Sequence, residues 1–320
     1  MIDVKKDSII RQICNIYELG KLISYEKENS SQNDVYKVAT DKDIYIIKEF
    51  SKDAIGNYYH LSKRKKQIEI SEKFKKHNIN TITPIKFKKN YFFLFNNKYY
   101  LIYSYKESKI KEVNELEYKN ITSLAKVQAN IHKLRLRTKL PCTYKKVNID
   151  FDKYLLKYKN DKELYNTLLE NKDKLEDLIN CCNINITEMK SKLCISHNDY
   201  KPKNILWSQD EPILIDFDAM GLVNHACALS ESAFTFSNLN TYINYDFYKL
   251  YLKEYINVYG SFNEDYKKAL YVSMNGKLRW YVYLLSKNDK EGIISMTKEL
   301  VLFYNNIDKF YSIYENINNK

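Results

Sequence analysis

Apolar and polar residues alternate with a period of two along residues 23–50, in three pieces. The second piece is DVYKVAT (34–40) and the third is IYIIK (44–48), and the polar stretches NSSQND and TDKD separate the pieces. Such alternation is typical of strands with one buried face, and short polar stretches between strands favour tight turns. The pattern therefore predicts an antiparallel meander.

Residues 53–78 are polar and helix-favouring, with apolar anchors that include Leu61 and Phe74. The runs YFFLF (91–95) and YYLIYSY (99–105) are strand-like and flank a turn at Asn96-Asn97-Lys98. With a short amphipathic helix in residues 1–24, the first hundred residues are expected to form about five strands and one main helix. The basic run KRKK (63–66) is expected to be an exposed face of that helix.

After Lys106 the pattern becomes helical. Helices are predicted over residues 112–137, over 151–180 and from 229 to the end, while LCIS (193–196) and ILIDF (213–217) are short strands. The fold class is therefore α+β and bilobal, with a boundary at 105–112. A small antiparallel-sheet lobe spans residues 1–105, and a larger, mostly helical lobe spans 110–320.

Composition narrows the function only slightly. The chain has 320 residues and a net charge of +12, but its basic residues are scattered, so the charge is attributed to solvated faces and no nucleic-acid partner is expected. The six cysteines form no CxxC pair and no zinc spacing. The N-terminus lacks a signal-peptide core and no apolar window is long enough to span a bilayer, so a cytoplasmic protein without a membrane partner is expected. The oligomeric state is left open.

The stretch HNDYKPKN (197–204) carries the candidate chemistry. It follows the LCIS strand, and a predicted hairpin leads from it to Asp216 at the end of another strand. Asn204 and Asp216 supply the hard oxygen ligands that Mg²⁺ prefers beside a triphosphate. Asp199 is a carboxylate that can orient an acceptor hydroxyl and take its proton. These residue types at strand ends predict phosphoryl transfer from a metal–nucleotide complex.

A lysine is needed to neutralise charge on the phosphates, and Lys48 at the end of the YIIK strand is the candidate. A strand lysine, an H-x-D-x-x-x-x-N loop and a D-F-x element together form the signature of kinases. All three occur here in the expected order. The cofactors predicted are Mg²⁺ and ATP or GTP.

These motifs resemble the aminoglycoside phosphotransferase/choline kinase superfamily, which has the protein-kinase-like fold. The resemblance covers roughly residues 22–230 and rests on HNDYKPKNIL, ILIDFD, YIIKEF, NSSQNDVYKV, LIYSYKES and LAKVQANIHKL. It implies an N-terminal nucleotide-binding lobe and a C-terminal lobe with the catalytic loop and substrate site. It also implies that His197 is mainly structural.

The resemblance implies further nucleotide contacts. Backbone N–H groups of Ser30 and Ser31 would cover the phosphates. The resemblance of LIYSYKES places a hinge at about 103–109, which contains Tyr103 and Tyr105. Lys48 also needs a carboxylate on the main helix of the small lobe. Glu69 is favoured over Glu72, although the usual family position could fall on Gln67.

The sequence departs from the family pattern in three places. The phosphate turn contains no glycine, and Ala228 stands where the family has an aspartate that braces the catalytic loop, a task that could fall to Glu231. Lys201 lies two residues after Asp199, as in protein kinases, and could contact the transferring phosphoryl group. Asp218 could be a secondary metal group or a solvent-facing residue.

The function predicted is that of a small-molecule kinase whose partner is a hydroxyl substrate. An aminoglycoside phosphotransferase-like enzyme, of the kind that can confer antibiotic resistance, is the first hypothesis. A kinase of choline, ethanolamine or another amino alcohol or sugar is the alternative. A protein kinase and a non-catalytic relative of the spore-coat type stay open as further hypotheses.

Overall fold

The computed structural model of the protein describes residues 4–28, 33–50 and 58–318. The chain divides into two compact units. Unit 1 comprises Met1–Lys109 and Ile213–Asp218, and unit 2 comprises Ile110–Pro212 and Ala219–Lys320. The short segment Ile213–Asp218, which the sequence pattern placed in the C-terminal lobe, is thus part of unit 1.

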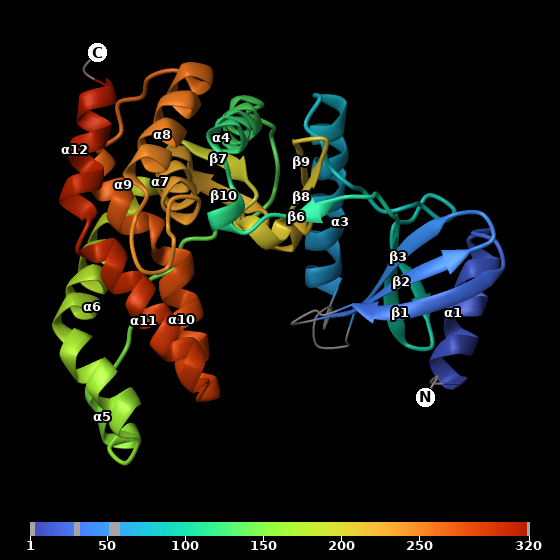
Figure 1. Cartoon of the computed structure of the whole chain (residues 1–320), viewed down its shortest axis with the longest axis horizontal. Coiled ribbons are helices and arrows are strands. Elements are labelled where there is room, and N and C mark those ends of the chain that lie inside the picture. Colours follow the sequence, from blue (N-terminus) through green and yellow to red (C-terminus); the bar gives the residue numbers. More distant parts are fainter. Residues whose placement is uncertain (1–3, 29–32, 51–57, 319–320) are drawn as a thin grey trace. The chain divides into compact units, whose positions relative to one another are not determined.

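Unit 1 is built on a five-stranded antiparallel sheet (Figure 1). The strand order is β1-β2-β3-β5-β4, and the meander predicted for residues 23–50 is confirmed as its first three strands. The strands are β1 (Leu22–Glu28), β2 (Asp34–Thr40), β3 (Ile44–Phe50), β4 (Phe93–Phe95) and β5 (Lys98–Ser104).

The turn predicted at residues 96–98 is a two-residue hairpin connection between β4 and β5. Asn96 and Asn97 have φ angles of 46° and 59°. Two successive residues with positive φ define the turn whose twist matches that of an antiparallel pair, and asparagine tolerates this conformation better than most residues. The asparagine pair therefore fixes the register of the hairpin.

In the described part of unit 1, helices α1 and α3 pack on the sheet. Helix α1 (Val4–Ile16) contributes Ile10, Ile13 and Cys14 to a core that includes Ile47 of β3. Helix α3 (Tyr58–Lys76) contributes Ile68 to a second core, which contains Phe50 and Leu101. Because side chains alternate across a strand, Ile47 and Lys48 point to opposite faces of β3.

The segment Ile213–Asp218 is held in unit 1 by backbone pairing and by an aromatic contact. Leu214 forms a parallel bridge with Thr81, and its N–H donates to the Asn80 carbonyl at 2.9 Å. The ring of Phe217 meets the ring of Phe74 edge-on, with centroids 6.1 Å apart. Helix α3 and the segment that carries Asp216 are therefore joined by a buried contact between two aromatic rings.

Phe74→Ala is expected to lower the free energy of unfolding by about 3–5 kcal/mol, because Phe74 is fully buried and its loss leaves a cavity beneath Phe217. Urea unfolding followed by circular dichroism measures the effect. Lys75→Ala, an exposed change on the same helix, is the control. Equal stability of the two variants would contradict the packing described here.

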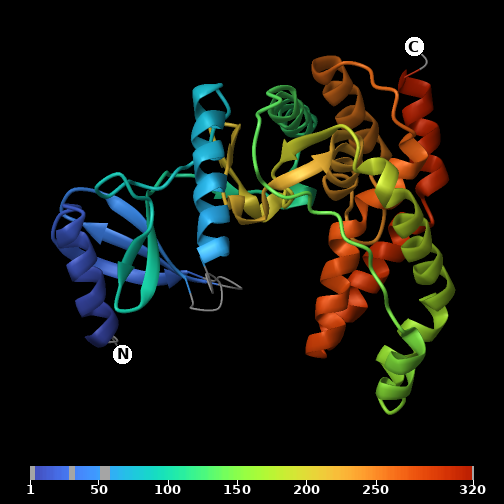
Figure 2. The same ribbon diagram turned by 180° about the vertical axis from the view of Figure 1, so that it is seen from behind.

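Unit 2 is mostly helical (Figures 1 and 2). Its short strands are β7 (Leu193–Ser196), β8 (Ile205–Ser208) and β10 (Gly221–Asn224), while β6 (Lys109–Ile110) and β9 (Glu211–Leu214) lie where the chain passes between the units. The helices are α4 (Tyr118–Lys133), α5 (Phe151–Tyr158), α6 (Lys162–Met189), α7 (His225–Thr235), α8 (Tyr245–Tyr259), α9 (Tyr266–Ser273), α10 (Asn275–Lys287), α11 (Lys290–Tyr304) and α12 (Ile307–Asn318).

The single helix predicted over residues 151–180 is wrong, because two helices occupy the region. Helix α5 ends at Tyr158, and Asp161 caps the start of α6 by accepting from the Leu164 N–H at 3.2 Å. Asparagine and aspartate compete with the helical backbone for hydrogen bonds, so the Asn160-Asp161 pair breaks the helix. Helix α6 then runs beyond the predicted end to Met189 (Figure 2).

The helix predicted over 112–137 is shorter in the structure. A 3₁₀ turn (Val113–Glu115) comes first, and α4 begins at Tyr118, where the Asn120 side chain accepts from the Glu117 N–H. Helix α4 packs on α8 and hydrogen-bonds α7, since the Gln128 amide donates to the Ala228 carbonyl at 3.0 Å. No helix in the described part of the chain has the length and apolarity needed to cross a membrane.

Candidate active site

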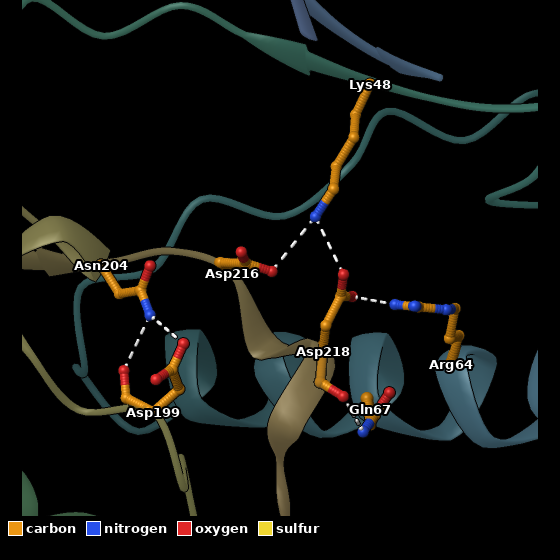
Figure 3. Close-up of polar contacts among 7 residues, drawn as sticks. All are labelled: Lys48, Arg64, Gln67, Asp199, Asn204, Asp216 and Asp218. Atoms are coloured by element: carbon orange, nitrogen blue, oxygen red, sulfur yellow. Dashed lines mark hydrogen bonds and ion pairs between the residues drawn. The ribbon is translucent and has the colours of Figure 1, made fainter. Parts of the chain in front are cut away.

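Lys48 of β3 lies between two carboxylates in unit 1 (Figure 3). Its Nζ is 3.1 Å from Asp216 Oδ1 and 2.9 Å from Asp218 Oδ2. The chain turns sharply here, because Asp216 has a φ of 58°, a conformation that few residues other than glycine, asparagine and aspartate adopt. The structure thus brings together the predicted pair Lys48 and Asp216.

The electrostatics of this group favour its charged state. Burial alone would lower the pKa of Lys48, but the carboxylates of Asp218 and Asp216 outweigh it and the pKa is raised. Burial alone would raise the pKa of Asp218, but the cations of Lys48 and Arg64 outweigh it and the pKa is lowered. Lys48 and Asp218 therefore stay ionised at neutral pH.

The basic run 63–66 is not an exposed face, which corrects the expectation from sequence. The Arg64 side chain is only 16% exposed and forms an ion pair with Asp218 Oδ1. One turn further along α3, the Gln67 side-chain amide donates to the Asp218 carbonyl at 3.0 Å (Figure 3). Periodicity could not reveal this, because a cation that points inward needs a partner from a distant segment.

The two glutamates of α3 lie elsewhere. Glu69 is exposed and is not among the ion-pair partners of Lys48 in the described residues. Glu72 accepts from the Tyr91 hydroxyl at 2.7 Å and from Lys86 Nζ at 3.2 Å. The structure therefore does not bring either predicted helix carboxylate to Lys48.

Of the remaining nucleotide contacts predicted in unit 1, Ser30 and Ser31 lie outside the described residues. Tyr103 of β5 is half-buried, and burial raises the pKa of its hydroxyl in the field of Lys48 and Asp218. Tyr105 follows the end of β5 and is also half-buried, with Lys37 Nζ 4.6 Å from the centre of its ring. Tyr103 is thus near the lysine group, whereas Tyr105 is held by a surface contact.

In unit 2, two residues of the loop after β7 contact the Asp199 carboxylate, and Figure 3 shows one of them, Asn204. Asn204 Nδ2 donates to Asp199 Oδ2 at 2.7 Å and to the Asp199 carbonyl at 2.8 Å. Lys201 Nζ lies 2.5 Å from Asp199 Oδ1. The structure thus brings together the predicted residues Asp199, Lys201 and Asn204, and Lys201 meets the carboxylate itself.

The loop is braced by residues that the sequence did not single out. The Tyr200 hydroxyl donates to the Leu124 carbonyl of α4 at 3.0 Å, and Asn198 Nδ2 donates to the Ala219 carbonyl at 3.3 Å. A side chain at Gly221 would collide with Thr143, at 2.7 Å, and would crowd Asn198, so only glycine fits beside the loop. Residue 228 is an alanine and has no carboxylate with which to brace the loop. The hydrogen bonds of Tyr200 and Asn198 hold the loop instead.

Asn204 of unit 2 and Asp216 of unit 1 each offer an oxygen of the kind that Mg²⁺ prefers. The Asn204 amide nitrogen donates both of its hydrogen bonds to Asp199, and this fixes the orientation of the amide. Asn204 Oδ1 is then available to a ligand. Asp216 is 41% exposed, and only one of its carboxylate oxygens is paired with Lys48. The described residues contain no group of three or more His, Cys, Asp or Glu that could hold a metal. One amide and one carboxylate suit Mg²⁺, which takes its remaining ligands from phosphates and water.

The sequence pattern indicated Glu231 only as a possible brace of the catalytic loop, and the structure places it in a charged group of unit 2. Its Oε1 would be 3.8 Å from a Cβ at Gly276, next to Lys277, which pairs with Glu299 at 2.9 Å. Burial raises the pKa of Glu231 to about 7, with Lys277 opposing the shift and Asp199 adding to it. The carboxylate therefore titrates near neutral pH and within the field of Asp199.

Glu231→Gln is expected to change how stability depends on pH. The folded-state pKa, about 7, lies above the ordinary value of 4.5, so the contribution of Glu231 to stability is complete below about pH 4.5 and is lost as pH rises through 7. After a discount for partial exposure, the variant should gain about 1–2 kcal/mol over wild type at pH 8 and nothing at pH 4.5. Urea unfolding at both pH values measures this.

The control for this prediction is Glu291→Gln, which changes an exposed glutamate of α11. That variant should follow the wild-type pH profile. If Glu231→Gln also follows it, the carboxylate titrates normally in the folded protein and the burial argument fails.

The chain matches the model of a known protein family. The model of the phosphotransferase enzyme family matches residues 28–227, which is more than half of the chain. The matched range includes Lys48, Asp199, Asn204 and Asp216. Comparison with curated proteins gives no match.

Solved structures resemble the whole chain. A spectinomycin phosphotransferase in complex with ADP and spectinomycin has a TM-score of 0.67 at 13% identity, covering 96% of this chain and 98% of its own. An amicoumacin kinase with AMP-PNP and Ca²⁺ has a TM-score of 0.62 at 14% identity, covering 95% and 93%. A choline kinase from Streptococcus pneumoniae has a TM-score of 0.58 at 15% identity, covering 94% and 99%. The predicted α+β, protein-kinase-like fold is confirmed.

Proposed function

Because this chain belongs to the phosphotransferase enzyme family, we propose that it is a small-molecule kinase that transfers the γ-phosphoryl group of a Mg-nucleotide to a substrate hydroxyl. The arrangement around Asp199 carries the proposal. Its carboxylate is oriented by Asn204 on one oxygen and by Lys201 on the other. A carboxylate held in this way can accept a proton from a hydroxyl that attacks phosphorus.

The roles of the residues follow from their chemistry. Asp199 accepts the hydroxyl proton while the hydroxyl oxygen bonds to the γ-phosphorus, and the bond from that phosphorus to the β-phosphate oxygen breaks, which leaves the nucleoside diphosphate. Lys48 binds phosphate oxygens through its ammonium. Asn204 and Asp216 would hold Mg²⁺, which neutralises phosphate charge. Lys201, next to Asp199, is placed to neutralise charge on the transferred group.

The nucleotide is proposed to be ATP or GTP, with Tyr103, Tyr105 and the backbone of Ser30 and Ser31 as further contacts. Support for an adenine nucleotide comes from the ADP and AMP-PNP complexes of the similar structures. The acceptor is proposed to be an amino alcohol or an aminoglycoside-like antibiotic. Similar structures include enzymes named for spectinomycin and amicoumacin, and the likeness to choline kinase keeps choline and ethanolamine as the second candidate.

A nucleotide-consumption screen tests the proposal. Purified protein is incubated with Mg-ATP or Mg-GTP and a panel of aminoglycosides, spectinomycin, choline, ethanolamine, other amino alcohols and sugars. Acceptor-dependent release of the diphosphate supports the kinase function and identifies the substrate class. Silence across the panel, together with no thermal shift by Mg-ATP or Mg-GTP, would instead support a non-catalytic relative.

A further inference from the structure

The carboxylate partners of Lys48 come from the segment after β9 and not from α3. Asp218 Oδ2 lies 2.9 Å from Lys48 Nζ, closer than Asp216 Oδ1 at 3.1 Å. Both Lys48, 13% exposed, and Asp218, 33% exposed, are shielded from water. An ion pair in such surroundings is screened less than one on the surface, so it restricts where the lysine ammonium can lie.

We propose that Asp218 is the residue that positions Lys48 for the nucleotide, in place of a helix glutamate, and that Arg64 and Gln67 of α3 position Asp218. This inference rests on the proposed function. Arg64 pairs with Asp218 Oδ1, which leaves Oδ2 for the lysine. The Gln67 amide holds the backbone carbonyl of the same residue at 3.0 Å. Helix α3 thus contacts Asp218 at two atoms, Oδ1 and the backbone carbonyl oxygen, without supplying a carboxylate.

At this point α3 carries a cation, Arg64, and not the glutamate that was expected to pair with Lys48. A helix glutamate would be attracted to Lys48 directly, whereas the cation Arg64 can act on Lys48 only through an intervening anion. Asp218 is that anion. The two cations also share an apolar support, because Lys48 Nζ and the Arg64 guanidinium lie 5.3 Å and 5.0 Å from the centre of the Phe50 ring.

This arrangement separates the tasks of the two aspartates. If Asp218 restrains Lys48, the Asp216 carboxylate is free to exchange its lysine contact for a metal ion when a nucleotide arrives. A single aspartate would have to hold the lysine ammonium and a metal ion, two cations that repel each other, on one carboxylate. Asp218 and Arg64 are therefore positioning residues, which act on the nucleotide through Lys48.

A double-mutant cycle tests the proposal with Lys48→Met, Asp218→Asn and the combined variant. The first readout is the urea midpoint of the nucleotide-free protein. Non-additivity is expected, because each single change takes one partner away from the half-buried charge that remains, whereas the combined change removes both charges. Additive midpoints would overturn the pairing. This readout does not depend on nucleotide binding, so it decides the pairing even if the kinase proposal fails.

The second readout is the affinity for Mg-ATP, measured by calorimetry. Asp218→Asn is expected to weaken binding about tenfold in the wild-type background, which corresponds to about 1.4 kcal/mol, and to cause no further loss in the Lys48→Met background. An equal loss in both backgrounds would mean that Asp218 acts on its own, for example on the metal, and would overturn the proposal. Wild-type protein that binds neither Mg-ATP nor Mg-GTP would refute the proposed function and not the pairing.

Variants on α3 test whether Arg64 positions Asp218. Arg64→Met should weaken Mg-ATP binding as Asp218→Asn does, whereas Arg64→Lys should recover part of the loss because it keeps the charge. Lys75→Met removes an exposed cation from the same helix and is the matched control. If Glu69→Gln weakens binding while Asp218→Asn and Arg64→Met do not, the helix glutamate is the positioning residue and the proposal is wrong.

Discussion

Asp199→Ala is expected to lower turnover by about 10²–10⁴-fold and to leave Mg-nucleotide affinity largely unchanged. The loss follows from removing the carboxylate that accepts the hydroxyl proton. Nucleotide affinity should persist because Asn204 keeps its hydrogen bond to the backbone carbonyl of residue 199, at 2.8 Å, when the side chain is gone. The orientation of the proposed metal ligand thus does not depend on the Asp199 side chain.

Single-turnover phosphoryl transfer to the acceptor found by the screen, with calorimetry for Mg-ATP, measures both parts. The control is Asp308→Ala, which removes an 89% exposed aspartate of α12. Turnover that survives in Asp199→Ala would show that another group takes the proton. A matching loss of nucleotide affinity would show that residue 199 holds the metal ligand through its side chain after all.

Asp216→Ala is expected to remove the metal-dependent part of nucleotide binding. Loss of even a supporting contact to a metal ligand costs about 10–100-fold in metal affinity, and loss of the ligand itself should cost at least as much. Affinity for metal-free ATP should hold or increase, because Lys48 loses one of its two competing carboxylates. Calorimetric titrations with ATP, with and without Mg²⁺, separate these effects.

The difference between the two titrations decides the assignment. If Asp216→Ala binds Mg-ATP as tightly as wild type, Asp216 is not a metal ligand. If it loses affinity equally with and without Mg²⁺, the aspartate acts through Lys48 instead. Asp308→Ala again serves as the matched change and should leave both titrations unaltered.

Local patterns sufficed for the sheet of unit 1. Period-two alternation over residues 34–50 and the Asn96-Asn97 pair each report a structure that forms between neighbours in sequence. The helix over 151–180 was predicted too long because hydrophobic periodicity continues through Asn160-Asp161, where side-chain capping ends one helix and starts the next. Capping depends on one or two polar atoms, to which a periodicity count gives no weight.

The catalytic motifs were readable for a similar reason. Asp199, Lys201 and Asn204 lie within one loop, so their spacing in sequence constrains their spacing in the structure. Arg64 and Asp218 are far apart in sequence, and a lysine- and arginine-rich run gives no sign of which cation turns inward. Which cation turns inward depends on the position of Asp218, and only the tertiary structure shows that position.

The segment Ile213–Asp218 also has a consequence for how the protein can be dissected. Unit 1 takes these residues from the middle of the sequence of unit 2, so no single cut in the chain releases either unit whole. A truncation at the hinge would yield a sheet without Leu214 and Phe217, two side chains that unit 1 buries, and without the aspartates that face Lys48. An isolated nucleotide lobe would have to be made by fusing residues 213–218 onto the end of the first 109. The boundary of unit 1 is therefore spatial and cannot be written as one interval of residue numbers.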